Sequence, residues 1–366
     1  MAKMYAGVDV GYGQVKVVFG DALNSRSKVL FPYAIKRGEI GRIIFPELLP
    51  NVIEITNKYW LCIDGVDVQI GENAGSIKSR IEKSISKRDY VDYRIMALGS
   101  IAMLLQEKGL NFIDLCLTVG TPKTVVDEMK NNLISVLSGE HNFKVCWFGE
   151  KAKKDCSNIH INVNKVDIFE QGVGAFVSLS MLFDENGNIK GLDRNAVNGS
   201  IAVLDIGTYT TNFVLFSNGR YESRKSESGF DFGTANVIDT LREEIFKMYG
   251  ISFPPHIINK SIVMNDSSKI IIGSENIDVT ELKEKLLDLS WQDLSKYIKD
   301  SIEVAKLEAY QSKNPGLKVV FTGGGAKLFA DRLKKEFNGD MFVYSRDPVF
   351  DNALGFFIVG YFANKG

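Results

Sequence analysis

The sequence is short of the residues that build several common active sites. Its three histidines are scattered, and it contains neither an HExxH zinc motif nor a GxSxG nucleophile elbow. No glycine is followed directly by lysine, which excludes a Walker A phosphate-binding loop. The four cysteines form no CxxC pair, so we expect neither a structural zinc site nor a thioredoxin-like motif, and we expect a reducing compartment.

The sequence also lacks an excess of either charge and any long apolar run. Its 44 basic and 45 acidic residues give a net charge of −1, which excludes a protein that wraps nucleic acid electrostatically. The longest uncharged apolar runs, Gly172–Phe183 and Ala353–Ala363, are shorter than the ~18 residues that a membrane span needs. The start of the chain has no signal-peptide pattern. We therefore expect a cytoplasmic protein with no direct contact to nucleic acid or membrane.

What the sequence does contain is an internal duplication in 366 residues, a length typical of about two domains. Each half begins with an apolar–Asp–apolar–Gly segment, a short turn and an apolar strand. Each then has a strand that ends at glycine, and later a Gly- and Ala-containing helix that follows an acidic or amide residue. The matched pairs are Val8–Phe19 with Leu204–Phe216, Leu115–Gly120 with Val319–Gly325, and Glu170–Ala175 with Asp351–Phe356. Three matches in one order predict two similar α/β domains with a cleft between them.

Periodicity and helix signals predict the elements around this duplication. The expected helices are Tyr90–Lys108, Thr121 to about Leu137, Glu170–Phe183, Gly233–Tyr249, Thr280–Leu289, Trp291–Gln311 and Asn352–Ala363. A capping-box pattern at Ser290 separates the fifth helix from the sixth. The segment Ile262–Ile272 favours strands.

The two glycine turns have the chemistry of a phosphate site. A glycine-containing hairpin turn presents backbone N–H groups to an anion. Asp9 and Asp205 end the strands before the turns, and carboxylates suit a hydrated Mg²⁺. Lys16 follows the first turn and can reach a phosphate oxygen. The alternatives are that each aspartate caps its turn and that Lys16 is an exposed strand residue.

A run of three glycines, Gly323–Gly325, follows the strand that starts at Val319. Such a run occurs where the backbone approaches another group closely or turns sharply. In this position it favours a nucleoside lying against the backbone, and the alternative is a simple turn into a helix.

Together these segments resemble the superfamily of actin, heat-shock chaperones and sugar kinases. The start Asp-x-Gly-Tyr-Gly-x-x-Lys and the ending Asn-Ala-x-Gly-Phe look most like the ParM/StbA-type plasmid-segregation actins of bacteria and archaea. The matched motifs are phosphate-1 at Asp9–Lys16, connect-1 at Glu170–Ala175, phosphate-2 at Asp205–Thr211, the adenosine motif at Thr322–Ala326 and connect-2 at Asn352–Phe356.

The fold that the resemblance implies is α/β, a duplicated actin-like (ribonuclease H-like) fold with two domains and a nucleotide cleft between them. Residues 1–170 would form domain I, to which the C-terminal helix 351–366 returns, and residues 171–350 would form domain II.

The resemblance also implies roles for single residues. Glu170 matches the residue that orients the attacking water, with Gln171 as the competing candidate. Asp9 and Asp205 would hold the metal through water. The residues implied in nucleotide binding are Gly11, Tyr12, Gly13, Gln14, Lys16, Gly207, Thr208, Tyr209, Thr210, Arg242, Glu243, Gly323, Gly324, Gly325 and Ala326.

The implied function is a filament driven by nucleotide. Copies of the chain would bind ATP or GTP with Mg²⁺, polymerise, and hydrolyse the nucleotide to ADP or GDP, which weakens the filament. The partners would be the protein itself and a DNA-bound adaptor through which plasmids are moved. The regions Val29–Asp67 and Ser261–Lys313, which match the known bacterial actins poorly, are expected to make filament contacts.

Three alternatives remain from the same superfamily. A small-molecule kinase would need an aspartate base, for which Asp167 and Asp231 are the candidates. A chaperone-like or scaffold ATPase would need a separate partner, because Gly366 follows closely on connect-2. A membrane-bound role like that of MreB would need an amphipathic anchor, for which Met1–Tyr5 is too short.

Overall fold

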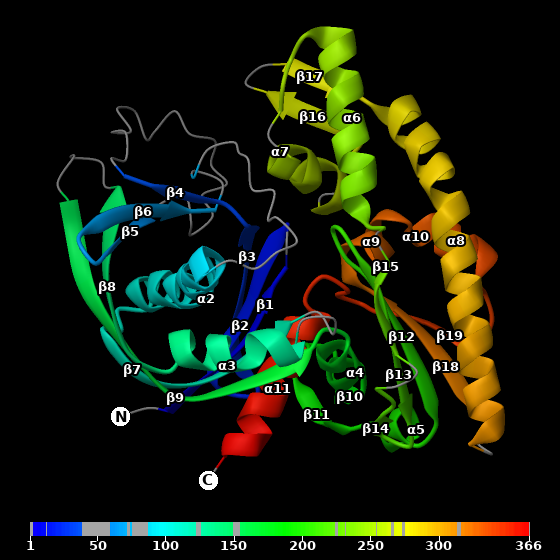
Figure 1. Cartoon of the computed structure of the whole chain (residues 1–366), viewed down its shortest axis with the longest axis horizontal. Coiled ribbons are helices and arrows are strands. Elements are labelled where there is room, and N and C mark those ends of the chain that lie inside the picture. Colours follow the sequence, from blue (N-terminus) through cyan, green and yellow to red (C-terminus); the bar gives the residue numbers. More distant parts are fainter. Residues whose placement is uncertain are drawn as a thin grey trace. The chain divides into compact units, whose positions relative to one another are not determined.

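The computed structural model describes residues 3–11, 13–38, 59–71, 74, 87–121, 126–148, 154–223, 226–230, 232–253, 255–264, 267–272, 275–312 and 316–365 (Figure 1). The chain divides into two compact units. Unit 1 comprises Met1–Gly120, Val126–Ile168 and Phe356–Gly366, and unit 2 comprises Thr121–Val125 and Phe169–Gly355. Within the described part of the chain, no helix combines the length and the apolar character that a membrane crossing needs.

Unit 1 is built on a mixed sheet in the order β3-β2-β1-β7-β9-β8-β5-β6-β4. Its strands are β1 (Lys3–Val10), β2 (Gln14–Ala22), β3 (Ser25–Pro32), β4 (Ile35–Arg37), β5 (Tyr59–Ile63), β6 (Val66–Ile70), β7 (Phe112–Thr121), β8 (Gly139–Phe148) and β9 (Lys154–Glu170). Its helices are α2 (Lys87–Glu107), α3 (Val126–Leu137) and most of α11 (Asp351–Asn364). The apolar side chains of α2, among them Leu98, Ile101 and Leu105, are fully buried, which confirms the predicted helix.

Unit 2 repeats the start of this arrangement. Its main sheet has the order β14-β13-β12-β18-β19, and β15 also pairs with β13. Its strands are β10 (Met181–Phe183), β11 (Ile189–Leu192), β12 (Ser200–Ile206), β13 (Thr211–Ser217), β14 (Arg220–Tyr221), β15 (Glu227–Phe230), β16 (Lys269–Ile272), β17 (Glu275–Asp278), β18 (Leu317–Thr322) and β19 (Phe342–Tyr344). Its helices are α4 (Val173–Leu179), α5 (Arg194–Val197), α6 (Thr234–Tyr249), α7 (Pro255–Asn259), the π-helix η4 (Lys260–Met264), α8 (Thr280–Gln311), α9 (Gly323–Leu328) and α10 (Ala330–Glu336).

The duplication predicted from the sequence is present in the strand pairing. In unit 1, β1 pairs antiparallel with β2 and parallel with β7. In unit 2, β12 pairs antiparallel with β13 and parallel with β18. The α/β fold and the two hairpins that open the halves are therefore confirmed.

Three expected elements differ from the structure. The helix expected over Glu170–Phe183 is only α4, because Gly172 has a φ of +90° and the chain forms β10 after Ser180. The segment expected as strands from Ile262 begins as the π-helix η4, whose Ile262 and Val263 are buried in the unit 2 core. The two helices expected on either side of Ser290 form the single helix α8, because Leu287 and Leu294 continue one buried face past that serine.

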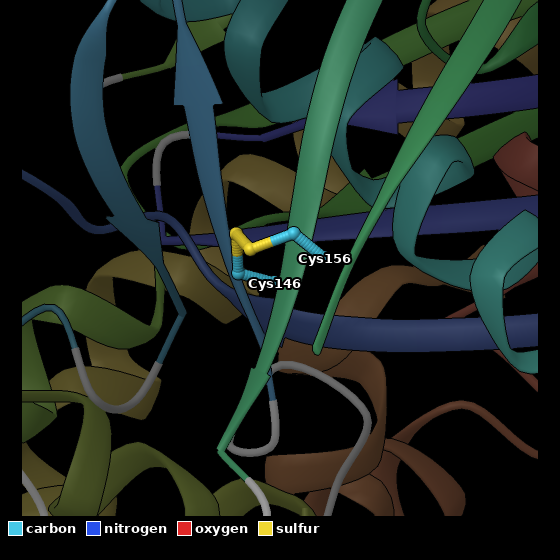
Figure 2. Close-up of a disulfide and its surroundings, with 2 residues drawn as sticks. All are labelled: Cys146 and Cys156. Carbon is cyan, nitrogen blue, oxygen red and sulfur yellow. A yellow bond between two sulfur atoms is a disulfide. The ribbon is translucent and has the colours of Figure 1, made fainter. Parts of the chain in front are cut away.

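A disulfide joins the two strands of the β8–β9 hairpin. Cys146 lies opposite Cys156 in the strand register, with the two Cα atoms 4.0 Å apart, and Figure 2 shows the bond between the strands. Disulfides persist in oxidising compartments and are rare in the cytosol. The bond therefore disagrees with the expectation of a reducing compartment. Cys62 and Cys116 are free.

Candidate functional site

The two glycine turns close in the same way. In unit 1, the Gly11 amide donates to the Gln14 carbonyl at 3.0 Å, and in unit 2 the Gly207 amide donates to the Thr210 carbonyl at 2.8 Å. A Cβ atom added to Gly11 or Gly207 would lie only 3.1 or 3.0 Å from that carbonyl oxygen. The backbone of each turn is therefore tight, as the predicted phosphate-binding nests require. Gly13 lies in the first turn, and Tyr12 falls outside the described residues.

Asp9 and Lys16 form an ion pair at the first turn. The two residues are opposite each other in the β1–β2 register, and the Lys16 Nζ lies 3.0 Å from the Asp9 Oδ2. The Lys16 side chain is only 14% exposed and the Asp9 side chain 5%, so Lys16 is not a solvated strand lysine. A Cβ atom added to Gly11 would lie 3.2 Å from the Nζ, so the ammonium group is beside the turn. Burial, together with the charge of Asp9, raises the pKa of Tyr93 well above its usual value.

Asp205 occupies the matching place in unit 2, but its partner is different. The residue opposite it in the β12–β13 register is Asn212, where unit 1 has the lysine. The Asp205 Oδ2 instead accepts a hydrogen bond of 2.8 Å from the side-chain amide of Asn352 in α11. The Asn352 Oδ1 accepts the amides of Gly172 and Ala175 at 2.9 and 3.1 Å. One buried side chain thus links Asp205 to the start of α4.

The three glycines after β18 pack against the end of β12. Gly323 has a φ of +86°, and a Cβ atom there would lie 2.4 Å from the Ile206 carbonyl oxygen and 2.5 Å from the Asp205 Oδ1. A Cβ atom on Gly325 would lie 2.1 Å from the Ile206 Cγ2. At Gly324 the nearest atom would be the Val263 Cγ1 at 3.7 Å, an ordinary contact. Packing therefore requires Gly323 and Gly325 to be glycine, whereas Gly324 has room for a Cβ atom. Ala326 is buried in α9.

The second turn also rests on the first residues of α6. The amides of Thr234 and Ala235 donate to the carbonyls of Gly207 and Thr208 at 3.1 and 2.7 Å. Tyr209 is 41% exposed beside them. Arg242 comes eight residues after the start of α6, about 12 Å along the helix axis at 1.5 Å per residue. The described structure thus does not place Arg242 or its exposed neighbour Glu243 next to this turn, and the Arg242 guanidinium lies 3.8 Å from Asp239.

Glu170 and Gln171 precede α4, where β9 ends. The Glu170 carboxylate accepts a hydrogen bond from the Tyr221 hydroxyl. Burial, the hydrogen bond and the negative charge of Glu170 all raise the pKa of Tyr221, with burial the largest cause. The Gln171 amide donates to the Thr121 carbonyl at 2.8 Å. The Glu170 carboxylate is therefore held in a fixed orientation by a neutral donor.

Three residues near these groups were not predicted as site residues, although the sequence placed Asp351 and Asn352 at the start of the duplicated helix and Asn352 in connect-2. Asn352 and Tyr221 are described above. Asp351 is buried at the start of α11, and its carboxylate accepts hydrogen bonds from Thr322 at 2.6 Å and from Ser178 at 3.4 Å. Burial raises the pKa of Asp351 to about 6. No local signal reveals these contacts, since the partners are 29 to 180 residues apart in the sequence.

The carboxylates of Asp9 and Asp205 are the groups predicted to hold a Mg²⁺ ion through its waters. Among the described residues there is no group of three or more His, Cys, Asp and Glu side chains that could enclose a metal ion. Asp9 binds Lys16 and Asp205 binds Asn352, so each carboxylate already has a protein partner. Such carboxylates fit an ion held through its waters, and Mg²⁺ keeps several of its waters and needs few protein ligands.

The kinase candidates have less support. Asp167 lies 3.5 Å from Lys165 and accepts a hydrogen bond from Asn364, so its carboxylate is engaged within unit 1. Asp231 falls outside the described residues.

Comparison with known proteins agrees with this duplicated arrangement. A family model described as the N-terminal domain of actin-like proteins matches residues 7–174, and one described as the C-terminal domain of the archaeal actin homologue MreB-like matches residues 203–335. A comparison with curated proteins found no match.

Solved structures show the same fold over the whole chain. The archaeal actin homologue Ta0583 is 21% identical, with a TM-score of 0.68 and full coverage of both chains. ParM of Bacillus thuringiensis with ATP is 15% identical, with a TM-score of 0.71 and full coverage of both chains. The subunit of a 15-stranded ParM filament from Clostridium botulinum is 19% identical, with a TM-score of 0.65 and coverage of 98% of this chain and 99% of that one. The resemblance seen in the sequence is thereby confirmed, and the chain belongs to the actin-like superfamily.

Proposed function

We propose that this protein is a nucleotide-hydrolysing, filament-forming actin-like protein. The observation that carries the proposal is the repeated turn, in which a buried aspartate one residue from the end of a strand is followed by a tight glycine turn. Both the filament and the bound nucleotides of the similar ParM proteins add support, although those findings belong to those proteins.

In this proposal the nucleotide is ATP or GTP with Mg²⁺. The amides of Gly11 and Gly207 close the two turns, and the amides of Gly13 and Thr208 would bind phosphate oxygens, assisted by the Lys16 ammonium group. The proposed contacts further include Tyr12, Gln14, Tyr209 and Thr210 at the turns, Arg242 and Glu243 on α6, and Gly323–Ala326 near the nucleoside. Asp9 and Asp205 would hold Mg²⁺ through its waters, and the ion, when bound, would offset negative charge on the phosphates.

Hydrolysis needs a water positioned against the terminal phosphorus. We assign this to Glu170, whose carboxylate would accept the proton of the water as the new P–O bond forms and the bond to the bridging oxygen breaks. The hydroxyl of Tyr221 would keep the carboxylate oriented. Gln171 remains the competing residue, and variants of each residue distinguish them.

The more specific function we propose is plasmid segregation through a DNA-bound adaptor protein in the cytoplasm, a compartment in which a disulfide such as Cys146–Cys156 is rare but does occur. The net charge of −1 supports indirect rather than direct contact with DNA.

The first test is high-speed sedimentation of the purified protein with Mg²⁺ and ATP, GTP, ADP or no nucleotide. Triphosphate-dependent pelleting that EDTA abolishes is the expected result. Nucleotide binding without pelleting under any condition would contradict the filament, and we would then screen for small-molecule phosphoryl acceptors.

A further inference from the structure

Unit 2 carries two groups of large apolar side chains that the fold leaves in solvent. The first, the α6 patch, consists of Phe246, Met248 and Tyr249 at the end of α6, which are 55%, 62% and 47% exposed. The second, the α8 patch, consists of Val304, Leu307 and Tyr310 near the end of α8, which are 45%, 58% and 83% exposed.

Neither patch contributes to the unit 2 core. On α6 the core-facing residues are Leu241 and Ile245, which are fully buried, and the patch begins at the next residue. On α8 the residues Ile302, Ala305 and Ala309 face the core. The α8 patch residues recur every three positions, so they form one stripe on the opposite side of the helix. Aromatic residues and methionine are enriched at protein interfaces, and both patches contain tyrosine.

The two patches lie at opposite ends of unit 2. The α8 patch is at the end of the sheet where strands β12 and β18 begin. Leu317 starts β18 just after α8 and pairs with Ser200, the first residue of β12. Helix α6 begins at the opposite end of the sheet, just after the last residue of β12, where the Thr234 amide donates to the Gly207 carbonyl. From there the helix continues away from the sheet. The length of strand β12 contributes about 20 Å to the separation of the two patches, and the length of helix α6 contributes about 24 Å. Figure 1 shows the last turns of α6 and α8 at the two ends of the unit.

We propose that the α6 patch of one copy binds the α8 patch of the next copy. A single copy cannot join its own two patches, because they lie at opposite ends of one compact unit. Contact between two different patches of identical chains is heterologous, and unless it closes into a ring it continues as a filament. The inference rests on the proposed function and names surfaces of this chain that would make the filament contact.

The charges beside the patches permit this contact. The α6 patch is bordered by the pair Glu244–Lys247, whose charged atoms lie 2.7 Å apart. The α8 patch is bordered by the pair Glu303–Lys306 at 2.8 Å. Each pair is neutral within itself, and Glu243, whose charge also acts on Lys247, adds one negative charge beside the α6 patch. Two such borders meet without repulsion between like charges, and either lysine can instead reach a glutamate of the neighbouring copy.

The test uses two double variants. Phe246→Glu with Met248→Glu blocks the α6 patch, and Leu307→Glu with Tyr310→Glu blocks the α8 patch. These side chains are exposed, so folding should persist, which thermal unfolding checks. Each variant alone should need at least about tenfold more protein to form filaments, since charged side chains at the centre of an interface remove its principal contacts. The matched control is Leu182→Glu on β10, which is 49% exposed and lies outside both patches.

Mixing the two variants gives the decisive result. The α6-blocked copy still has an α8 patch, and the α8-blocked copy still has an α6 patch, so a one-to-one complex and nothing longer should appear in analytical ultracentrifugation. Self-association of either variant into a dimer would overturn the inference, because it indicates pairing of identical patches. Filament formation by both variants at the wild-type concentration would overturn it while leaving the proposed function intact.

Failure of the proposed function gives a different result. If the wild type forms no filament with any nucleotide, the proposed function is wrong. The mixture of the two variants still tests whether the α6 patch binds the α8 patch. A one-to-one complex would then support the patch pairing on its own. Its absence at high protein concentration would overturn the pairing as well.

Discussion

The side-chain amide of Asn352 donates a 2.8 Å hydrogen bond to the carboxylate of Asp205, while the carbonyl oxygen of the same amide accepts the Gly172 and Ala175 amides. An aspartate proposed to hold the metal is thus fixed to the first turn of α4 through one residue of α11. Glu170 lies two residues before Gly172. The proposed metal-holding and water-orienting residues therefore share a common support.

Replacing Asn352 should damage this support. Asn352→Ala removes three buried hydrogen bonds, one to Asp205 and two from the amides of Gly172 and Ala175, which should lower the free energy of unfolding by about 2–4 kcal/mol. Nucleotide binding should weaken as well. Urea unfolding and a fluorescent nucleotide titration measure the two effects. Asn364→Ala, near the end of the same helix, is the control and should cost under about 1 kcal/mol. Equal costs for the two variants would contradict the role of Asn352.

Gly323 should tolerate no side chain. Gly323→Ala places a Cβ atom 2.4 Å from the Ile206 carbonyl oxygen at a φ of +86°, so both overlap and backbone strain act. We expect a loss of about 3 kcal/mol or more in the free energy of unfolding. Gly339→Ala is the control, because its φ is +103° but nothing lies within 4 Å of the added atom. The control should lose only about 1–2 kcal/mol, which chemical denaturation can resolve.

Asp351 should make stability depend on pH. Burial raises its pKa to about 6 from the ordinary value of 3.8, so the folded protein binds this proton more tightly than the unfolded chain. The stabilisation is fully present below about pH 4 and is lost as the pH rises through about 6. Relative to Asp351→Asn, the wild type should lose about 2–2.5 kcal/mol between pH 4 and pH 7, most of the full effect at 1.36 kcal/mol per pKa unit. Urea unfolding of both proteins at the two pH values measures this, and a constant difference would contradict the prediction.

The Cys146–Cys156 bond predicts a thiol count. Of the four cysteines, only Cys62 and Cys116 should react with a thiol reagent in denaturant, and all four should react after reduction. Because the bond closes a loop with a sequence separation of 10, reduction should cost about 2.5 kcal/mol through the entropy of the unfolded chain. Cys62→Ser serves as the control and should leave the effect of reductant unchanged. Four reactive thiols before reduction would show that the bond does not form.

The sequence was most informative where local spacing determines structure. The repeated apolar–Asp–apolar–Gly pattern predicted both hairpins, because alternation sets the strands and glycine permits the turn. It was less informative where tertiary packing overrides local preference. Ser290 has the signal of a helix start, yet burial of Leu287 and Leu294 on one face keeps α8 continuous. The β-branched residues around Ile262 favour a strand, but they fill the unit 2 core from a π-helix.

The supporting contacts of the candidate site could not be predicted for a different reason. Asn352 meets Asp205 across 147 residues, and Tyr221 meets Glu170 across 51. Only the folded chain brings such partners together: the connect-2 pattern includes Asn352 but does not name its partner, and no sequence pattern marks Tyr221. The same holds for Cys146 and Cys156, which become neighbours through the register of the β8–β9 hairpin.

In the proposed function, nucleotide hydrolysis by Glu170 controls assembly. Its most direct test is right-angle light scattering of wild type, Glu170→Ala and Gln171→Ala after addition of Mg²⁺ and ATP or GTP, with phosphate release followed in parallel. For the wild type and Gln171→Ala, scattering should rise and then decay as nucleotide is consumed. For Glu170→Ala, scattering should rise and persist, with phosphate release slowed by about 10²-fold or more. Two results would contradict control of assembly by Glu170. One is flat scattering of the wild type although nucleotide is bound, and the other is scattering of Glu170→Ala that decays at the wild-type rate.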